Sequence, residues 1–413
     1  MSDSFSIKTE PWLSAPETRA VIDALTANGG QARFVGGCVR NALLGVEVGD
    51  IDIATPLLPE EVTRRAEAAG LYAVATGIEH GTVTVVSRSK PFEVTTLRRD
   101  VSTDGRRATV AFTADWDEDA RRRDFTMNAL YADASGQVFD CVGGIADLRA
   151  GRVRFIGDAY TRIAEDHLRI LRLFRIHAWY GKGEIDGDAL RAAAAAKGSI
   201  KTLSGERIHK EMLRLLAAPD PVPMLRTMGA SSVLAEVIAG PLMFERFRRV
   251  CEIDGDSFFA ADGLLRLGAI LGGEAQAKAV ASSWRMSNDE RHRLVQMMTA
   301  PSKIVSYLSI REVRRALYRH GVERFKDLVR LRWAEDPKAS NSVQWRALVA
   351  LADNWVRPQF PLTGLDVMAA GVPEGPLVGR VLGEVEEWWI DSDFTDDQFS
   401  LAERLKAVVQ AAI

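Results

Sequence analysis

Cysteine is scarce in this chain, with only Cys38, Cys141 and Cys251 among 413 residues. Their unrelated spacings argue against a disulfide framework or a zinc site and favour a reducing cytoplasm. Long apolar runs are also missing, and the N-terminal stretch lacks the apolar core of a signal peptide, so we expect no contact with a membrane. The net charge is -3, so an RNA-binding protein of this composition must concentrate its positive charge locally.

What the chain does contain is typical of a globular protein of several domains, since 47% of its residues are hydrophobic and 26% are charged. Alternating or β-branched runs predict strands at 32–35, 51–54, 81–87 and 92–97, and a helix follows Pro59. Beyond about residue 150 the patterns are helical, including 190–196 and 204–216. The sequence therefore predicts an α+β head with a mixed sheet, followed by an all-helical remainder.

The most informative residues are Asp50 and Asp52, which lie one residue apart next to an apolar run. On a strand, both carboxylates would point to the same face, where they repel each other unless a cation lies between them. Mg²⁺ favours such oxygen ligands and leaves positions open for phosphate. Upstream, Gly36-Gly37 predicts a turn before a helix that carries Arg40, and backbone amides with a guanidinium can bind phosphate. The combination suggests metal-dependent nucleotidyl transfer.

The order strand, Gly-Gly turn, helix and Asp-x-Asp strand resembles the nucleotidyltransferase superfamily, in which DNA polymerase beta has the same kind of palm. The pattern Gly-Gly-x-Val-Arg-x-x-Leu-Leu-Gly is similar to that of its class II RNA branch, which contains bacterial CCA-adding enzymes and poly(A) polymerases. This resemblance implies Asp50 and Asp52 as catalytic metal ligands and Gly37 and Arg40 as nucleotide contacts. Asn41 stands where the family usually has aspartate.

A second motif, residues 118–130, contains Arg-Arg-Arg-Asp-Phe-Thr-x-Asn-Ala. By itself, a run of arginines is usually a solvated patch. Here it is similar to a signature of the class II branch, and the resemblance implies that Arg123 contacts the nucleotide. A guanidinium offers bidentate geometry to triphosphate oxygens. Asn128 is a candidate for a sugar hydroxyl.

The third motif spans residues 163–175, where helical periodicity places four charged side chains on one half of a single predicted helix. The interpretation that needs no functional role is an amphipathic helix with one i,i+3 ion pair. The motif also resembles the family pattern in which an aspartate and the first arginine select the incoming base, and later arginines contact the nucleotide. A carboxylate and a guanidinium match the amino group and ring nitrogen of cytosine and adenine, and they mismatch uracil and guanine. The residues concerned are Asp166, Arg169, Arg172 and Arg175.

The segments between and after these motifs give weaker indications. Glu93 ends a predicted strand and could be a further catalytic carboxylate or a structural one. Residues 98–107 resemble the flexible loop that in CCA-adding enzymes accompanies the switch from C to A addition. The basic stretches at 311–320 and 324–332 are candidates for RNA backbone contacts. The acidic stretch 384–397 is not.

The resemblance implies four parts: a catalytic nucleotidyltransferase head at 1–150, a base-reading helical neck at 151–218, and an RNA-binding helical body and tail at 219–357 and 358–413. We expect an enzyme that adds CCA to the 3′ end of tRNA from CTP and ATP, with Mg²⁺ as cofactor and no DNA partner. A poly(A) polymerase, or an enzyme that adds only CC or A, would use the same scaffold. A catalytically silent RNA-binding protein is a third possibility.

Overall fold

The computed structural model describes residues 5–77, 81–104, 107–257, 259–299, 303–395 and 397–412. The chain divides into two compact units, Met1–Ala239 and Gly240–Ile413. The first contains a mixed sheet and helices, and the second is built from helices, so the α+β class is confirmed. The division into head, neck, body and tail stays a prediction, and the limit between the two units at Ala239 differs from the predicted boundary at residue 218.

The first unit is organised around a seven-stranded sheet with the order β3-β4-β5-β2-β1-β8-β9. Strands β2 and β5 are parallel, and the other neighbours are antiparallel. Alternation along β4 buries Val83 and Val85 and leaves Thr82 and Thr84 partly exposed, as expected of a half-buried strand. The strands are β1 (Arg33–Val35), β2 (Asp52–Thr55), β3 (Tyr72–Gly77), β4 (Thr82–Ser87), β5 (Lys90–Thr96), β8 (Leu130–Ala132) and β9 (Val138–Asp140).

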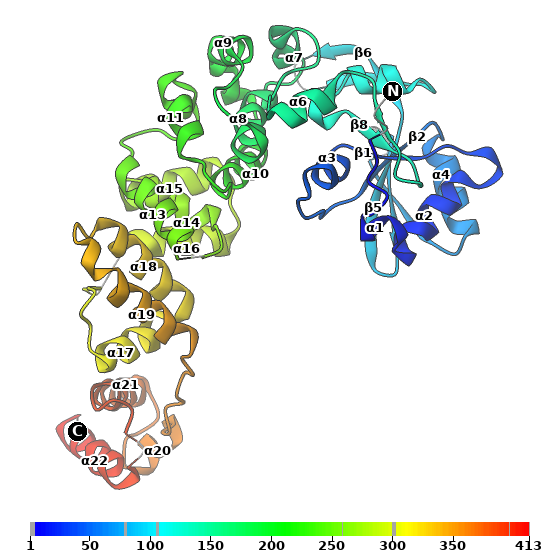
Figure 1. The fold of residues 1–413 in the computed structure, drawn as a ribbon. Coiled ribbons are helices and arrows are strands. Elements are labelled where there is room, and N and C mark those ends of the chain that lie inside the picture. Colours follow the sequence, from blue (N-terminus) through cyan, green and yellow to red (C-terminus); the bar gives the residue numbers. More distant parts are fainter. Residues whose placement is uncertain are drawn as a thin grey trace. The chain divides into compact units, whose positions relative to one another are not determined.

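Helices cover this sheet at two places (Figure 1). Helices α2 (Pro16–Thr26) and α4 (Pro59–Ala68) pack on the β3–β5 end, and α3 (Gly37–Leu44) packs against β1 and β8. Both α2 and α4 begin with proline, whose fixed φ and missing N–H suit the first turn of a helix. The shorter helices of this region are α1 (Pro11–Ser14), α5 (Trp116–Arg121) and α6 (Gly144–Ala150), with 3₁₀ turns η1 (Ala27–Gly29) and η3 (Thr126–Asn128).

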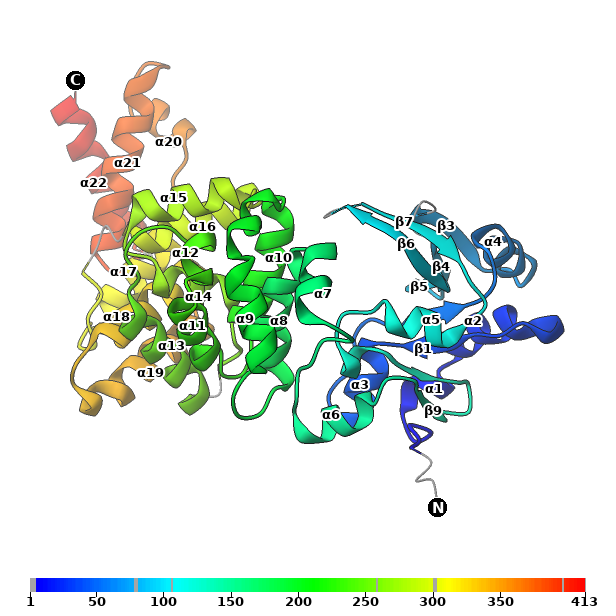
Figure 2. The same cartoon turned by 90° about the horizontal axis from the view of Figure 1, so that it is seen from above.

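Strands β6 (Arg98–Asp104) and β7 (Arg107–Phe112) pair antiparallel with each other and with no other strand of the described residues (Figure 2). The predicted loop at 98–107 is therefore largely strand, and its residues 105 and 106 lie outside the described residues. The sequence did not predict these strands because they are mostly polar. A hairpin that is separate from the main sheet shows little of the apolar alternation by which strands are recognised.

The helical part of the first unit begins after the sheet. Its α8 and α10 pack along each other, and α8 also packs on α11. One helix was predicted over residues 163–175, and this is wrong: α7 ends at Glu165, Asp166 has extended backbone angles (φ -150°, ψ 106°), and α8 starts at Leu168. The helices are α7 (Ala159–Glu165), α8 (Leu168–Tyr180), α9 (Gly187–Ala195), α10 (Gly205–Leu216), α11 (Val222–Ala230) and α12 (Val233–Val237), with a 3₁₀ turn η4 (Lys197–Thr202).

The second unit consists of packed helix pairs, and its described residues form no strand beyond the isolated bridge between Leu242 and Leu271. Near the C-terminus, α21 and α22 enclose a core that includes Val381, Val385 and Val408. Nowhere in the described chain is a helix both long enough and apolar enough to cross a bilayer. The helices are α13 (Phe244–Asp256), α14 (Gly263–Ile270), α15 (Glu274–Ser283), α16 (Asn288–Met298), α17 (Ile310–His320), α18 (Val322–Glu335), α19 (Ser342–Asp353), α20 (Gly364–Ala369), α21 (Pro376–Asp391) and α22 (Gln398–Ala412), with η5 at Ala339–Asn341.

Candidate active site

The carboxylates gather where β2 and β5 run side by side. Strand β2 begins at Asp52, so Asp50 lies in the preceding loop and not on the strand as predicted. Asp52 is directly opposite Glu93 in the parallel β2–β5 pair. Burial, reinforced by the nearby charges of Glu93 and Asp50 and partly offset by Arg123, raises the pKa of Asp52 to about 6. Carboxylate oxygens are the ligands that a hard divalent cation prefers, although the described residues contain no cluster of three His, Cys, Asp or Glu side chains placed to hold a metal ion.

The Gly-Gly turn begins α3, as predicted, but its two glycines differ in what they require. Gly36 has φ of +76°, which side-chain-bearing residues rarely adopt, and it leads the chain into α3. Gly37 is the first helical residue and has ordinary backbone angles, and a Cβ there would meet only Arg40 Nη2 at 3.7 Å. The conformational need for glycine therefore lies at Gly36, which sequence reasoning left out of the site.

Arg40 is almost fully buried and is held by three side chains. Its Nε and Nη2 donate to Asn41 Oδ1 at 3.2 and 2.9 Å, Nη1 donates to Asn128 Oδ1 at 2.5 Å, and Nη2 donates to Tyr180 Oη at 2.8 Å. The guanidinium also lies 3.8 Å from the Tyr180 ring centroid. Burial lowers the pKa of Arg40. These contacts fix Arg40 between α3 and the end of α8, and they occupy most of its donors.

Asp119, which sequence reasoning missed, anchors the arginine motif. Its side chain is 1% exposed, and it forms ion pairs of 2.7 Å with Arg122 and 3.0 Å with Arg123. Tyr131 also donates to it at 2.7 Å. Burial alone would raise the pKa of Asp119, but Arg123 and Arg122 outweigh burial and hold it at about 2. The carboxylate thus aligns two guanidinium groups side by side.

Asp124 connects the second motif to α8. It accepts hydrogen bonds from Arg172 Nε at 2.7 Å and from Asn128 Nδ2 at 3.1 Å. Asn128 Oδ1 in turn accepts a hydrogen bond from Arg40 Nη1. Burial alone would raise the pKa of Asp124, but the Arg172 charge and the hydrogen bonds outweigh burial and hold this pKa at about 2. Both the oxygen and the nitrogen of the Asn128 side chain are therefore engaged, although Asn128 still lines the cavity described below. A continuous polar chain joins α8, Asp124, Asn128 and α3.

Asp166 and Arg169 do not form the i,i+3 ion pair of the alternative, amphipathic-helix interpretation. Asp166 instead binds Arg207 of α10, whose Nη2 donates to its two oxygens at 3.0 and 2.8 Å. Arg169 binds Glu165 and donates to the carbonyl oxygens of Arg162 at 2.7 Å and of Arg122 at 3.3 Å.

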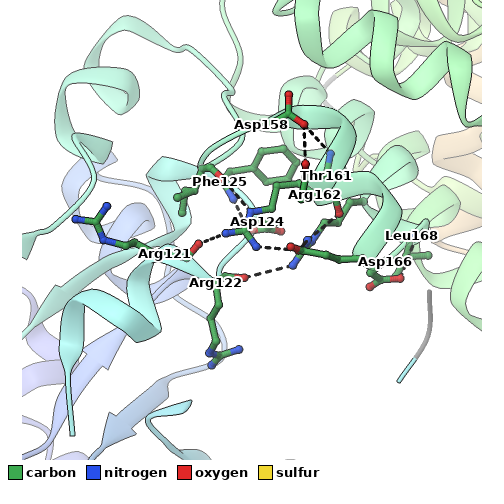
Figure 3. Close-up of polar contacts among 12 residues, drawn as sticks. Arg121, Arg122, Asp124, Phe125, Asp158, Thr161, Arg162, Asp166 and Leu168 are labelled. Carbon is green, nitrogen blue, oxygen red and sulfur yellow. Dashed lines mark hydrogen bonds and ion pairs between the residues drawn. The ribbon is translucent and has the colours of Figure 1, made fainter. Parts of the chain in front are cut away.

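The arginine motif and α7 lie together in Figure 3, where Asp158 accepts from Thr161 at the start of α7 and Arg162 donates to the carbonyl of Arg121. Backbone carbonyls of Arg121 and Arg122 in the second motif thus accept hydrogen bonds from Arg162 of α7 and from Arg169 of the third motif.

Two adjoining cavities collect the predicted residues. The first, of about 360 Å³, is lined by carboxylates of β2 and β5 and by the charged side chains of the second and third motifs. The second, of about 650 Å³, is strongly basic and includes Trp179 and Tyr180. Both share Asp52, Asn128 and Arg172. The first contains Asp52, Glu93, Arg122, Arg123, Asp124, Asp166, Arg169 and Arg172, and the second contains Gly37, Arg40, Asp50, Arg175, Arg207, Lys210, Glu211 and Arg214.

The predicted site residues thus divide between two neighbouring cavities that meet at Asp52. Arg175 lines the second cavity, whereas Arg169 lines the first. Arg175 binds Glu211 of α10. The ion-pair partners Arg207 and Glu211 lie in segment 205–211, and no pattern within the third motif could identify them.

The basic stretches proposed for RNA contact are largely paired with acidic side chains. In α17, Arg314, Arg315 and Arg319 bind residues of the acidic stretch 384–397. In α18, Arg330 binds Asp254. Since each of these charges is offset by a neighbour, the positive potential available to RNA there is smaller than the sequence indicates.

Comparison with known families finds matches to both parts of the first unit. Residues 32–154 match the family described as "Poly A polymerase head domain". Residues 184–243 match the family described as "Probable RNA and SrmB- binding site of polymerase A". The first of these stretches carries Asp50, Asp52 and Arg123, whereas Asp166 and Arg169 fall between the two.

Individual relatives cover nearly the whole chain. The "CCA-adding enzyme" of Streptococcus gordonii is 31% identical over 388 residues, which span 92% of this chain and 94% of that protein. The "CCA tRNA nucleotidyltransferase 1, mitochondrial" of Mus musculus is 29% identical over 384 residues, or 91% of this chain and 86% of that protein. Among solved structures, the Bacillus stearothermophilus CCA-adding enzyme in complex with CTP matches with a TM-score of 0.77 and 27% identity, over 97% of this chain and 98% of that one.

Proposed function

The chain belongs to the family of CCA-adding enzymes, and we propose that it adds CCA to the 3′ end of tRNA from CTP and ATP with release of pyrophosphate. The observation that carries this proposal is the first cavity. It brings a carboxylate of high pKa, Asp52, together with Arg123 and with the Asp166 and Arg169 pair. Nucleotidyl transfer needs these three elements: a site for metal, cations for the triphosphate, and polar groups that distinguish bases.

Mg²⁺ is the cofactor we propose, held by Asp50 and Asp52. The fit rests on the raised pKa of Asp52, which results from burial and from the nearby charges of Glu93 and Asp50, and which Arg123 offsets only in part. A magnesium ion bound there would supply Lewis-acid chemistry to phosphate oxygens. Glu93, directly opposite Asp52, would hold negative charge at the same place.

The triphosphate would lie against the arginines of the second and third motifs. Asp119 aligns Arg122 and Arg123, and Asp124 fixes Arg172, so the guanidinium groups are oriented before any nucleotide arrives. We retain Gly37, Arg40, Arg123, Arg172 and Arg175 as nucleotide contacts. Because Arg40 and Arg175 are tied to side chains of the second cavity, their action on the nucleotide would be less direct than that of Arg123.

Base selection would use Asp166 and Arg169 as separate groups. Among the described residues, Glu165 and the carbonyls of Arg162 and Arg122 account for three of the five N–H groups of Arg169. Two N–H groups remain for the ring nitrogen of cytosine or adenine, while Asp166 accepts from the amino group. Uracil and guanine would leave these groups unpaired.

The RNA end would enter through the second cavity. Its basic side chains suit a phosphate backbone, and Trp179 and Tyr180 offer rings on which a base can stack. Since the two cavities meet at Asp52, a 3′-hydroxyl there would face the triphosphate across the metal site. Under this proposal, residues 1–150 are the catalytic head, 151–218 read the base, and 219–357 and 358–413 bind further parts of the tRNA. The scarcity of cysteine favours the cytoplasm as the compartment.

The test is to offer tRNAs that end before C, after C and after CC, each with one labelled nucleoside triphosphate or with all four, and to sequence the products. We expect CC from CTP, then a single A from ATP, and no addition by Asp52→Ala. Long adenosine tails would indicate a poly(A) polymerase, and C alone or A alone would indicate a partial enzyme. Binding of tRNA without any addition would indicate a silent RNA-binding protein.

A further inference from the structure

The carboxylate of Asp166 is held from outside the first cavity. Its Oδ1 accepts the backbone N–H of Leu168 at 3.1 Å, and Arg207 Nη2 donates to Oδ1 at 3.0 Å and to Oδ2 at 2.8 Å. Arg207 lines the second cavity and not the first, whereas Asp166 lines the first and not the second. Arg207 thus reaches Asp166 from the side of the second cavity.

The Asp166 carboxylate has one hydrogen-bond acceptor position left for a ligand. A carboxylate offers about four lone-pair positions. Leu168 takes one on Oδ1, and Arg207 takes one on each oxygen. The position that remains is on Oδ2, and it suits one N–H of an exocyclic amino group. A second donor on the base would find no free acceptor on this carboxylate.

The orientation of Asp166 depends on Arg207 because little else restrains it. The residue lies at the break between α7 and α8, and its side chain is 31% exposed, so packing does not lock its torsion angles. Without Arg207, the Leu168 N–H would be the one donor left to this carboxylate among the described residues, and it contacts one oxygen. The carboxylate would then turn toward water.

We propose that Arg207 is the positioning residue for base selection: it fixes the Asp166 carboxylate so that Oδ2 accepts from the amino group of an incoming cytosine or adenine. This rests on the proposed function and deepens it. Arg207 does not touch the nucleotide, and its effect is confined to how sharply amino-bearing bases are preferred.

A purely structural role for Arg207 is the main alternative, since it also joins α10 to the start of α8. Two other contacts join the same helices, namely the ion pair of Arg175 with Glu211 and the donation of Trp179 Nε1 to the Arg214 carbonyl at 2.7 Å. Because these contacts remain when Arg207 is truncated, we expect the helix pair to stay packed.

The experiment compares Arg207→Ala, Arg207→Lys and the control Arg214→Ala, with CTP and UTP assayed separately on tRNA that ends before C and ATP assayed on tRNA that ends after CC. Arg214 is on the same helix, lines the same cavity and carries the same charge, but it does not bind Asp166. In Arg207→Ala we expect kcat/KM for CTP and for ATP to fall about tenfold, mainly through KM, because misplaced groups lose much of their effect. UTP use should be nearly unchanged, so the CTP to UTP ratio narrows by about the same factor. Arg207→Lys, which keeps a cationic donor, should recover part of this ratio.

Arg214→Ala should leave the CTP to UTP ratio unchanged, whatever it does to the KM for tRNA. Thermal melting of each variant checks the fold, and Arg207→Lys carries the test if Arg207→Ala does not fold. Equal losses for CTP and UTP, or a ratio that stays at the wild-type value, would overturn the inference. A wild-type protein that adds no CCA would instead overturn the proposed function, so the two failures are distinguishable.

Discussion

Replacing Asp119 with asparagine should weaken both the fold of the first unit and the use of nucleotides. The carboxylate is 1% exposed and binds two arginines and Tyr131. Asparagine keeps one acceptor oxygen and places an N–H₂ group against donors, so the guanidinium groups lose their charge partner. No sequence motif assigned a role to Asp119, so replacing it tests the construction of the site independently of the motifs.

The magnitude follows from the pKa of Asp119, which lies at about 2 in place of the ordinary 3.8. At about 1.4 kcal/mol per pH unit, this lowering contributes on the order of 2 kcal/mol to the free energy of unfolding at neutral pH. A carboxyl with a lowered folded-state pKa stabilises the protein above its unfolded pKa, and the contribution is lost as the pH falls through the folded pKa. The window therefore runs from about pH 4 down to pH 2, and about half of the contribution remains at pH 3.

Urea denaturation of wild type and Asp119→Asn at pH 7 and at pH 3 measures this dependence, with Asp23→Asn as the control. Asp23 is an exposed acidic residue of α2, so its replacement changes the charge equally without removing the arginine clamp. We expect the difference from wild type to be about 2 to 3 kcal/mol at pH 7 and about half of that at pH 3. In steady-state assays, kcat/KM should fall for CTP and ATP alike, since Arg122 and Arg123 lose their alignment. A difference that is the same at both pH values, or no difference at all, would refute the reasoning.

Three further predictions concern the predicted site itself. Because burial and neighbouring carboxylates raise the pKa of Asp52 to about 6, its charged form is costly above that pH. Asp52→Asn should therefore raise the melting temperature of the metal-free protein at pH 8 and abolish the stabilisation by Mg²⁺ that we expect of wild type; a stabilisation of the variant equal to that of wild type would argue against a metal site there. Arg123→Ala should weaken CTP and ATP alike, because the triphosphate is common to both, and loss of only one nucleotide in steady-state assays would show that Arg123 reads the base. Asp166→Ala should impair CTP and ATP together and relax the rejection of UTP and GTP by about tenfold to a hundredfold, and unchanged incorporation of all four nucleotides would place base selection elsewhere.

The sequence predicted the fold class because its signals are local. Apolar alternation identified β4 and β5, and helical periodicity identified α9 and α10. Asp52, Arg123 and Asp166, one from each of the three motifs, line one cavity, while the roles assigned to them stay predictions. Short strands such as β8 and β9 were missed, since three residues are too few to show a period.

What the sequence could not predict were the breaks and the long-range partners. Periodicity continues through Asp166, but its carboxylate captures the N–H of Leu168 and competes with helical hydrogen bonding. The sequence assigns Asp166 and Arg169 together to base selection, but it gives no sign of Arg207, 41 residues away, which binds Asp166. Ion pairs of this kind depend on how α8 and α10 pack, and no spacing rule within one motif contains that information.

The replacement of the usual aspartate by Asn41 illustrates how a motif can change one residue and keep its geometry. Arg40 needs an oxygen acceptor there, and both of its contacts to Asn41 use Oδ1, an atom that aspartate would also provide. The amide nitrogen adds a donation to the Glu47 carbonyl at 2.9 Å, which a carboxylate could not make. That bond joins α3 to the loop that leads to Asp50. With asparagine at this position, one negative charge beside Arg40 is absent, but Arg40 keeps its acceptor. The segment that leads to Asp50, a proposed metal ligand, has in addition a hydrogen bond to α3.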